Sequence, residues 1–325
     1  MRQAYFLKKS MLSLVAILLL APGCSQLKKR GELERKGQKS PAKEAQIQVL
    51  DDPSEMDGQD EDFQSLPPQI SRQSAKSVGL VFGSGGARSL AYAGVIRSFQ
   101  KNKINVTHIA ATGWSSLIGA SFALSGEVNG MDWKLYKLET LGLKFEKGFL
   151  GFGKSGATSK FNTYLAENFK NQSIESAKVG FSCASRSLGS NHSLLISSGD
   201  TVSALNACVP TPPFFNEYSK TSSPASLIKM AQHLRSLGAE IIVFVNVLDG
   251  SIQKEPLIKE ERLLRFSWSQ ILESHEVAER SIKNSYSLRL SAFSIFDFSK
   301  RKALEAEGER QGNLIAQKLI RSYGL

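Results

Sequence analysis

The chain has 325 residues, of which 41% are hydrophobic, so it is long enough for one large domain with a packed core. Its formal net charge of +11 favours contact with anionic surfaces. No basic helix and no basic strand with interleaved aromatic residues accompanies this charge. The composition therefore argues against nucleic acid and for an anionic membrane surface as the partner, with simple solubility as the alternative reason for the charge.

Residues 1–24 have the pattern of a secretory signal peptide. Three basic residues precede an apolar run over 11–21, which is too short to anchor the chain in a bilayer. The run leads to Gly23 and Cys24, a small residue before a cysteine, and this resembles the cleavage site of bacterial lipoproteins. We predict a lipoprotein signal peptide with Cys24 as the lipidated residue; a cleaved signal with an unrelated cysteine is the alternative. Because Ser25 rather than aspartate follows, we expect a lipid-anchored protein of the bacterial cell envelope, at the outer membrane.

Residues 25–75 show no apolar period, and their charges fall into a basic block followed by an acidic block. Such a segment cannot bury enough apolar surface to offset the entropy of ordering. We predict a disordered, charged tether that keeps the following domain close to the membrane. Contact of the basic block with anionic lipid headgroups is the alternative.

The folded domain is predicted to cover residues 76–325. Short apolar segments typical of buried strands alternate there with helical patterns. The expected strands cover residues 78–82, 106–111, 179–182, 194–197 and 240–247, and the expected helices cover 89–100, 133–141, 225–237, 263–286 and 300–323. This alternation implies an α/β fold with a mainly parallel sheet flanked by helices. Ligands of such sheets bind at the carboxyl ends of the strands.

Two glycine motifs follow the first two expected strands. The first, over residues 83–88, opens a helix, where converging backbone N–H groups suit a negative charge. It lacks the lysine-serine ending of a nucleotide-phosphate loop, so we set that function aside. The second, Gly113-Trp114-Ser115, stands between a strand and an apolar helical segment, which is the order of a nucleophile elbow. One loop would stabilise an anion, and the other would supply a nucleophile.

At these residues the chain resembles the patatin-like phospholipases, serine lipid acyl hydrolases with a glycine-rich oxyanion loop, a Gly-x-Ser-x-Gly elbow and a Ser/Asp dyad. The resemblance covers most of residues 76–250 in family order. It implies a patatin-like three-layer sandwich, a membrane lipid or lipid ester as ligand, and neither a cofactor nor a metal. By this resemblance Ser115 is the nucleophile, and the oxyanion loop contains Gly83, Gly85, Gly86 and Arg88.

Two positions in these motifs depart from the family pattern. Ser89 stands where a glycine usually follows the arginine, which restricts the backbone where the loop enters the helix. Leu117 stands where the elbow usually ends in glycine, and the next glycine, Gly119, comes two residues late.

The acid of the dyad has no obvious counterpart. The family's Asp-Gly pair should precede the strand at 240–247 by a fixed interval, and counting back lands on Ser222. No carboxylate lies within residues 218–239. Asp249, which precedes a glycine, is the candidate for a migrated acid, and Asp200 is a weaker one.

The remaining polar residues predict no further chemistry. Four histidines, His108, His192, His233 and His275, lie in no metal-ligand spacing, so we expect them to be structural or exposed. Cys183 and Cys208 are expected to be buried as small apolar residues, with a disulfide in an oxidising periplasm as the alternative.

Two functions from different classes follow. In the first, Ser115 attacks a phospholipid or neutral ester while N–H groups of Gly85 and Gly86 bind the oxyanion, and catalytic competence depends on finding the missing acid. In the second, the chain keeps a catalytically degenerate patatin fold as an envelope lipid-binding or interaction protein.

Lipidation of Cys24 is testable by fractionation. The Cys24→Ser variant should appear in the soluble periplasmic fraction or remain uncleaved, because the acyl chains that hold the protein on the membrane are lost. If the wild-type protein is already soluble after osmotic lysis, the lipoprotein interpretation is wrong.

Overall fold

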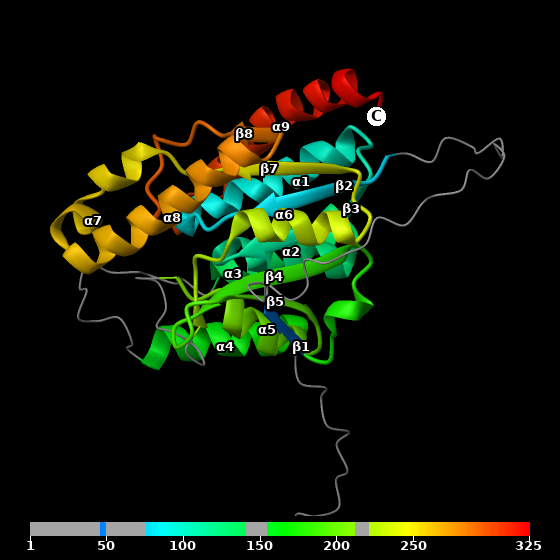
Figure 1. Cartoon of the computed structure of the whole chain (residues 1–325). Helices are drawn as coiled ribbons and strands as arrows, with labels where there is room; N and C mark the ends of the chain where they lie inside the picture. Colours follow the sequence, from blue (N-terminus) through cyan, green and yellow to red (C-terminus); the bar gives the residue numbers. More distant parts are fainter. Residues whose placement is uncertain (1–45, 50–75, 141–154, 212–220) are drawn as a thin grey trace, which may run out of the picture. The chain divides into compact units, whose positions relative to one another are not determined.

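The computed structural model describes residues 46–49, 76–140, 155–211 and 221–325 (Figure 1). The predicted signal peptide, Cys24 and most of the predicted tether lie outside the described residues. Within the described part, the strands form one sheet in the order β1-β5-β4-β3-β2-β7-β8, and β6 pairs with β4.

The strands from the middle of this sheet to one of its edges run parallel. They are β4 (Gly180–Ser187), β3 (Val106–Thr112), β2 (Val78–Phe82), β7 (Ile241–Asn246) and β8 (Asn284–Ser287). The antiparallel members are β5 (Ser193–Ser198), β1 (Gln46–Val49) and β6 (Thr221–Ser222). The mainly parallel α/β fold predicted from the sequence is therefore confirmed.

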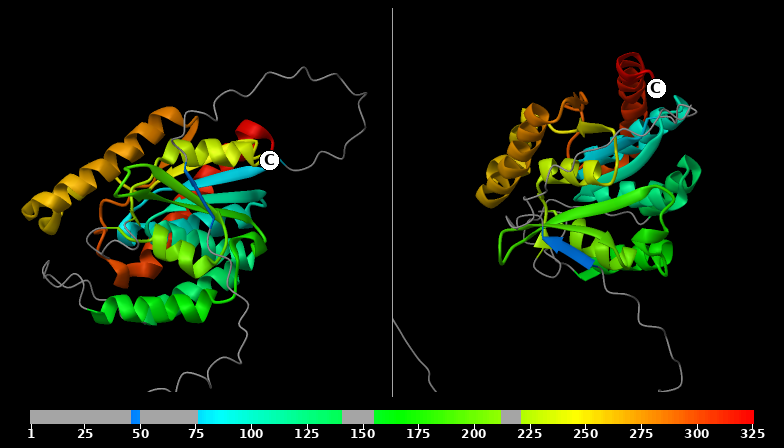
Figure 2. Two further views of the ribbon diagram at one scale, coloured as in Figure 1. Left: turned by 60° about the horizontal axis from the view of Figure 1, so that its bottom comes forward. Right: turned by 45° about the vertical axis from the view of Figure 1, so that its right-hand side comes forward.

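Helices cover both faces of the sheet, which gives the three layers seen in Figure 2. On one face, α6 (Leu227–Ser236) packs on Val81, Ala110 and Phe244 of the central strands, together with the end of α8 (Arg262–Ser281). The other face is covered mainly by α1 (Ala91–Lys101), α2 (Trp114–Ser125), α5 (Thr201–Cys208) and α9 (Arg301–Tyr323). Among the residues described, no helix combines the length and the apolar character needed to cross a membrane.

Shorter elements complete the domain. The remaining helices are α3 (Val128–Thr140), α4 (Ser155–Phe169) and α7 (Pro256–Glu260). The 3-10 turns are η2 (Gly86–Leu90), η4 (Ile174–Ser176), η5 (Gly250–Lys254) and η6 (Phe298–Lys300).

Two segments differ from the sequence-based expectation. The helix expected over 263–286 ends at Ser281, and Asn284–Ser287 instead forms β8 beside β7. The segment predicted as a disordered tether contains β1, which pairs antiparallel with β5 at the sheet edge. Both strands have only four residues and take their shape from a neighbouring strand, so local periodicity does not reveal them.

Cys183 and Cys208 form a disulfide, which corrects the expectation that they are separate buried residues. Cys183 lies in β4 and Cys208 ends α5, and the fold brings their Cα atoms to 6.0 Å. The bridge therefore fixes the end of α5 to the sheet.

The contact between α1 and α9 depends on two glycines that face each other. A Cβ atom at Gly94 would lie closer than 3.0 Å to main-chain atoms of Glu305, Gly308 and Glu309. One at Gly308 would approach the Ala91 main chain equally closely. Since side chains at the contact set the distance between packed helices, the two glycines allow these helices to touch along their backbones.

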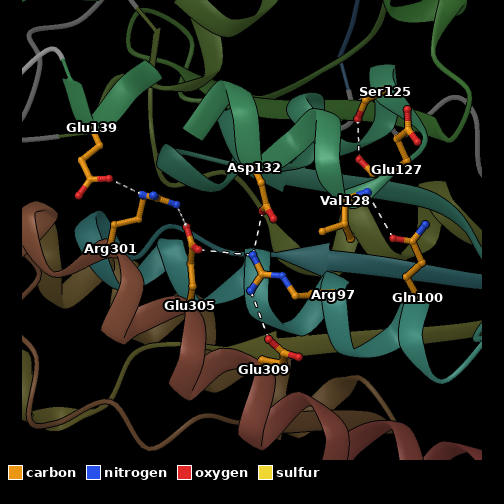
Figure 3. A network of polar contacts seen from close by, with 10 residues as sticks. All are labelled: Arg97, Gln100, Ser125, Glu127, Val128, Asp132, Glu139, Arg301, Glu305 and Glu309. Atoms are coloured by element: carbon orange, nitrogen blue, oxygen red, sulfur yellow. Dashed lines mark hydrogen bonds and ion pairs between the residues drawn. The ribbon is translucent and has the colours of Figure 1, made fainter. Parts of the chain in front are cut away.

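An ion-pair network connects the same helices to α3 (Figure 3). Arg97 of α1 pairs with Asp132 at 2.8 Å, with Glu309 at 3.3 Å and with Glu305 at 3.4 Å. The next pairs join Arg301 to Glu305 at 2.7 Å and to Glu139 at 2.9 Å. Burial raises the pKa of Glu305, although the two guanidinium groups favour its charged form.

Gly94→Ala should lower the free energy of unfolding by about 1–3 kcal/mol, because α9 has to move away to admit the methyl group. Chemical denaturation measures this loss. Gly189→Ala serves as the control, since a Cβ there meets nothing within 4 Å. Equal stability of the two variants would contradict the close backbone contact.

Candidate functional site

The predicted site residues gather where β2, β3 and β7 end. The glycine-rich loop follows β2, the Gly-x-Ser turn joins β3 to α2, and Asp249 follows β7. Because β2 is hydrogen-bonded to both other strands, these three connections meet at one edge of the sheet.

Arg88 of the glycine-rich loop is buried and holds neighbouring segments together. Its Nε donates to the Phe293 carbonyl at 2.8 Å, and its terminal nitrogens donate to Asp249 Oδ1 at 3.2 Å and Ser251 Oγ at 2.8 Å. The loop's main chain is attached to the same region, since the Ala87 N–H donates to the Ile295 carbonyl at 2.7 Å. The donors of Arg88 are therefore directed at the protein itself.

Asp249 is engaged by this arginine and by its own turn. Its carboxylate accepts hydrogen bonds from the Ser251 N–H at 3.0 Å and from the Ser251 hydroxyl. Burial raises its pKa, but the Ser251 hydrogen bonds and the Arg88 charge outweigh burial and lower the pKa overall. A carboxylate with a lowered pKa is a poor general base.

Gly113 occupies the apex of the turn between β3 and α2. Its φ of 68° and ψ of −146° lie in a region that side chains disfavour. Its N–H donates to the Cys208 carbonyl at 2.9 Å, so the end of α5 holds the turn. A Cβ on Gly113 would overlap the Ser84 hydroxyl and lie 2.9 Å from Thr211 Oγ1.

Ser115 lies two residues further, inside the first turn of α2. Its side chain is fully buried, and its hydroxyl faces the carbonyls of Thr112 at 2.9 Å and Phe82 at 3.0 Å. Within the described part of the chain, no hydrogen bond joins Ser115 to Asp249. The structure thus places both predicted residues at one sheet edge without pairing them.

The geometry favours a different register for the elbow. In a Gly-x-Ser-x-Gly elbow, the central serine sits on the strained strand-to-helix turn with its oxygen exposed. Here the strained residue is Gly113, with Ala111 two residues before it and Ser115 two residues after it. Gly113 therefore takes the position of the nucleophile, and Ser115 that of the closing glycine. The motif Gly-x-Ser-x-Gly does not reveal this register, because Ala111 and Ser115 replace its two glycines and Gly113 replaces its serine.

Buried hydroxyl groups surround the apex. Ser84 Oγ contacts Ser223 Oγ and lies 3.3 Å from the Thr112 carbonyl, and Thr112 Oγ1 lies 3.5 Å from Ser223 Oγ. The family's acid was expected at about Ser222, so the structure brings the adjacent Ser223 hydroxyl to that place. Thr211 completes the group on the side of α5. This cluster offers neutral hydrogen-bonding groups and no charge.

His275 is a residue of this region to which the sequence assigned no role. It lies in α8 with its ring against Gly83, where a Cβ would overlap the ring. Its Nδ1 is 2.6 Å from Asn246 Oδ1, and Asn246 Nδ2 donates to Glu279 at 2.9 Å. Burial lowers its pKa to about 3, against a smaller opposing effect of the Ser84 main chain. A buried neutral histidine thus supports the glycine-rich loop from beneath, and four scattered histidines gave no sequence signal for this role.

The other candidates have structural positions. Asp200 caps α5, with Oδ2 accepting from the Ser203 N–H at 2.8 Å. Leu117 belongs to the core, and Gly119 brings α2 close to Ile109 and Phe181. In the residues that the structure describes, no group of three or more His, Cys, Asp or Glu side chains is arranged to hold a metal ion.

A family model described as Patatin-like phospholipase matches residues 80–252, which is more than half of the chain. The matched range runs from β2 through the turn at Gly113 to η5, so it includes the whole candidate site.

Similar curated proteins are fungal lysophospholipases. The chain is 27% identical over 193 residues to Lysophospholipase NTE1 of Phaeosphaeria nodorum. The aligned segment covers 57% of this chain and 13% of that protein. It is 29% identical over 190 residues to Lysophospholipase nte1 of Aspergillus niger, covering 56% and 12% respectively. The match thus spans only about an eighth of these relatives. Among solved structures, VipD from Legionella pneumophila aligns over 74% of this chain and 66% of its own, with a TM-score of 0.37 and 11% identity.

The neutral state of His275 should make stability depend on pH. Below pH 6.5 the unfolded chain binds a proton at this residue, but the folded chain does so only near pH 3. The contribution of neutral His275 to the free energy of unfolding is therefore complete above pH 6.5. It is lost as the pH falls towards 3, at up to about 1.4 kcal/mol per pH unit. Denaturation of His275→Gln at several pH values should show a shallower pH dependence than wild type. The exposed His192→Gln variant is the control, and equal slopes in both variants would contradict this assignment.

Proposed function

The chain belongs to the patatin-like phospholipase family, and we propose that it is a lipid-binding member whose acyl-hydrolase centre has been lost. The observation that carries the proposed loss of the hydrolase centre is glycine at the apex of the β3–α2 turn. A phospholipase-type ancestry is consistent with the lysophospholipase relatives, whereas the specific role of this chain is the proposal.

The turn supports this proposal because it has no nucleophile to present. Gly113 has no side chain, and the nearby Ser115 hydroxyl is directed at main-chain carbonyls. A serine hydroxyl is a weak nucleophile at its ordinary pKa and needs an adjacent base for activation. The two main-chain carbonyls that Ser115 contacts cannot act as a general base.

The surroundings of the turn support it in a second, independent way. The expected acid position holds the hydroxyl of Ser223, and Asp249 is committed to Arg88 and Ser251. Loss of general-base assistance alone typically reduces a rate by roughly 10² to 10⁴. Glycine at the position of the nucleophile and serine at the position of the acid therefore support the proposal separately.

A working lipid acyl hydrolase is the second candidate. The family match across the whole site favours it, because a chain that keeps the fold around a catalytic centre often keeps the chemistry too. In that case Ser115 would have to leave its carbonyl partners and find a base when lipid binds.

We further propose that the protein is lipid-anchored through Cys24 in a bacterial cell envelope, at the outer membrane. The lipobox-like sequence motivates this location. The Cys183–Cys208 disulfide supports it, since disulfides persist in oxidising compartments such as the periplasm. The tether between Cys24 and β1 would then keep the lipid-binding domain near the membrane.

The proposal predicts that a fluorophosphonate probe, which reacts only with activated serines, does not label the wild-type protein. Hydrolysis of p-nitrophenyl esters should stay near the buffer rate, and Ser115→Ala should change it less than about twofold, because no activated serine is lost. Circular dichroism confirms that the variant is folded. Labelling of the wild type that Ser115→Ala abolishes would establish the working hydrolase instead.

A reconstruction provides the matched positive control. Gly113→Ser supplies a nucleophile at the apex. Ser84→Gly removes the hydroxyl that a Cβ at position 113 would overlap, and Ser223→Asp supplies an acid. If Gly113 occupies the nucleophile position, the triple variant should react with the probe where the wild type does not.

A further inference from the structure

An exposed apolar pair marks the start of α8. Leu263 is 74% exposed and Phe266 is 67% exposed, the two highest values for large apolar side chains in the described residues. Because they are three residues apart on a helix, they lie side by side on one face. The opposite face of the helix carries Leu264 and Trp268, which are buried in the core. Packing thus fixes the helix and turns the pair towards solvent.

Exposed basic side chains lie near this pair along the chain. Lys254, Lys259, Arg262 and Arg265 are all exposed. The acidic residues of the same stretch are Glu255, Glu260 and Glu261, of which only Glu260 is exposed. Glu255 faces the protein and accepts from Ser294 Oγ at 2.8 Å and from the Ile295 N–H at 3.3 Å. The exposed groups are therefore four cations, one anion and two large apolar side chains.

The patch belongs to the same edge of the sheet as the candidate site. η5 begins directly after Asp249, and η5, α7 and α8 pack against one another. Figure 1 shows α7 and the start of α8 beyond the ends of β2 and β7, on the side where the glycine-rich loop lies. The patch therefore lies on the same side of the domain as the candidate site.

We propose that Leu263 and Phe266, with Lys254, Lys259, Arg262 and Arg265 around them, form a docking face for an anionic lipid bilayer. Apolar side chains enter the boundary between headgroups and acyl chains while basic side chains contact the anionic headgroups, as on interfacial amphipathic helices. A second copy of this chain fits the patch less well, because its net charge of +11 repels four cations. The inference rests on the proposed lipid-binding function, for which it names the surface that meets the bilayer.

The test uses the full chain with Cys24→Ser. The other two cysteines form the disulfide, so a newly introduced cysteine can be labelled selectively. Gln270→Cys, one turn beyond Phe266, carries an environment-sensitive fluorophore. Vesicles made of equal parts of phosphatidylglycerol and phosphatidylcholine should raise the emission of this fluorophore and shift it to the blue. Vesicles of phosphatidylcholine alone should have little effect. A fluorophore at Leu314→Cys, an exposed position on α9, should not respond.

Substitutions then separate the two contributions to binding. Leu263→Ser with Phe266→Ser should weaken vesicle binding by roughly tenfold or more. Arg262→Gln and Arg265→Gln should each weaken it roughly fivefold, and this part should vanish at high salt. Leu188→Ser with Leu237→Ser, exposed leucines in the turns that follow β4 and α6, is the matched control and should bind like wild type.

Two results would overturn the docking face. One is vesicle binding without a response of the fluorophore at position 270, since another segment would then hold the membrane. The other is equal binding by the Leu263→Ser, Phe266→Ser variant and the wild type. Ester turnover by the wild type would overturn the degenerate site but not this face, because docking is measured without catalysis.

Discussion

No side chain fits at the apex of the turn between β3 and α2, and the candidate site is built around this restriction. The space that a Cβ of Gly113 would fill is taken by the hydroxyls of Ser84 and Thr211. The glycine-rich loop can therefore lie directly on the turn, and Ser223 reaches the same point from β6. Close packing of this kind leaves a small cluster of neutral hydroxyls where an elbow enzyme has its nucleophile.

The charged and titratable groups at this edge of the sheet hold loops in place. Arg88 is buried, and a buried guanidinium is stable only when its donors are satisfied, so it binds Asp249, Ser251 and the Phe293 carbonyl. His275 stays neutral beneath Gly83 because burial disfavours its charged form. The polar interactions of Arg88 and His275 thus fix the shape of the glycine-rich loop.

The C-terminal part of the chain takes part in that shape although it follows the range matched by the family model. Residues after 252 form α7, α8, β8 and α9. The carbonyls of Phe293 and Ile295 bind the glycine-rich loop, and α9 closes on α1 through Gly94 and Gly308. Loop, sheet and terminal helix therefore form one packed unit, and the apolar pair on α8 is left outside it.

The sequence by itself determined the alternation of buried strands with helices and the place of both glycine motifs at the strand ends. Each of these depends on residues close together in the chain, namely apolar runs and glycine clusters. Only the tertiary structure decided the register of the elbow, the partners of Asp249 and the disulfide. Gly113 and Ser115 are both compatible with a tight turn locally, and the choice between them depends on Ser84 and Thr211, which lie far away in sequence. The short strands β1 and β8 needed the same long-range information, because four residues take their shape from the strand they join.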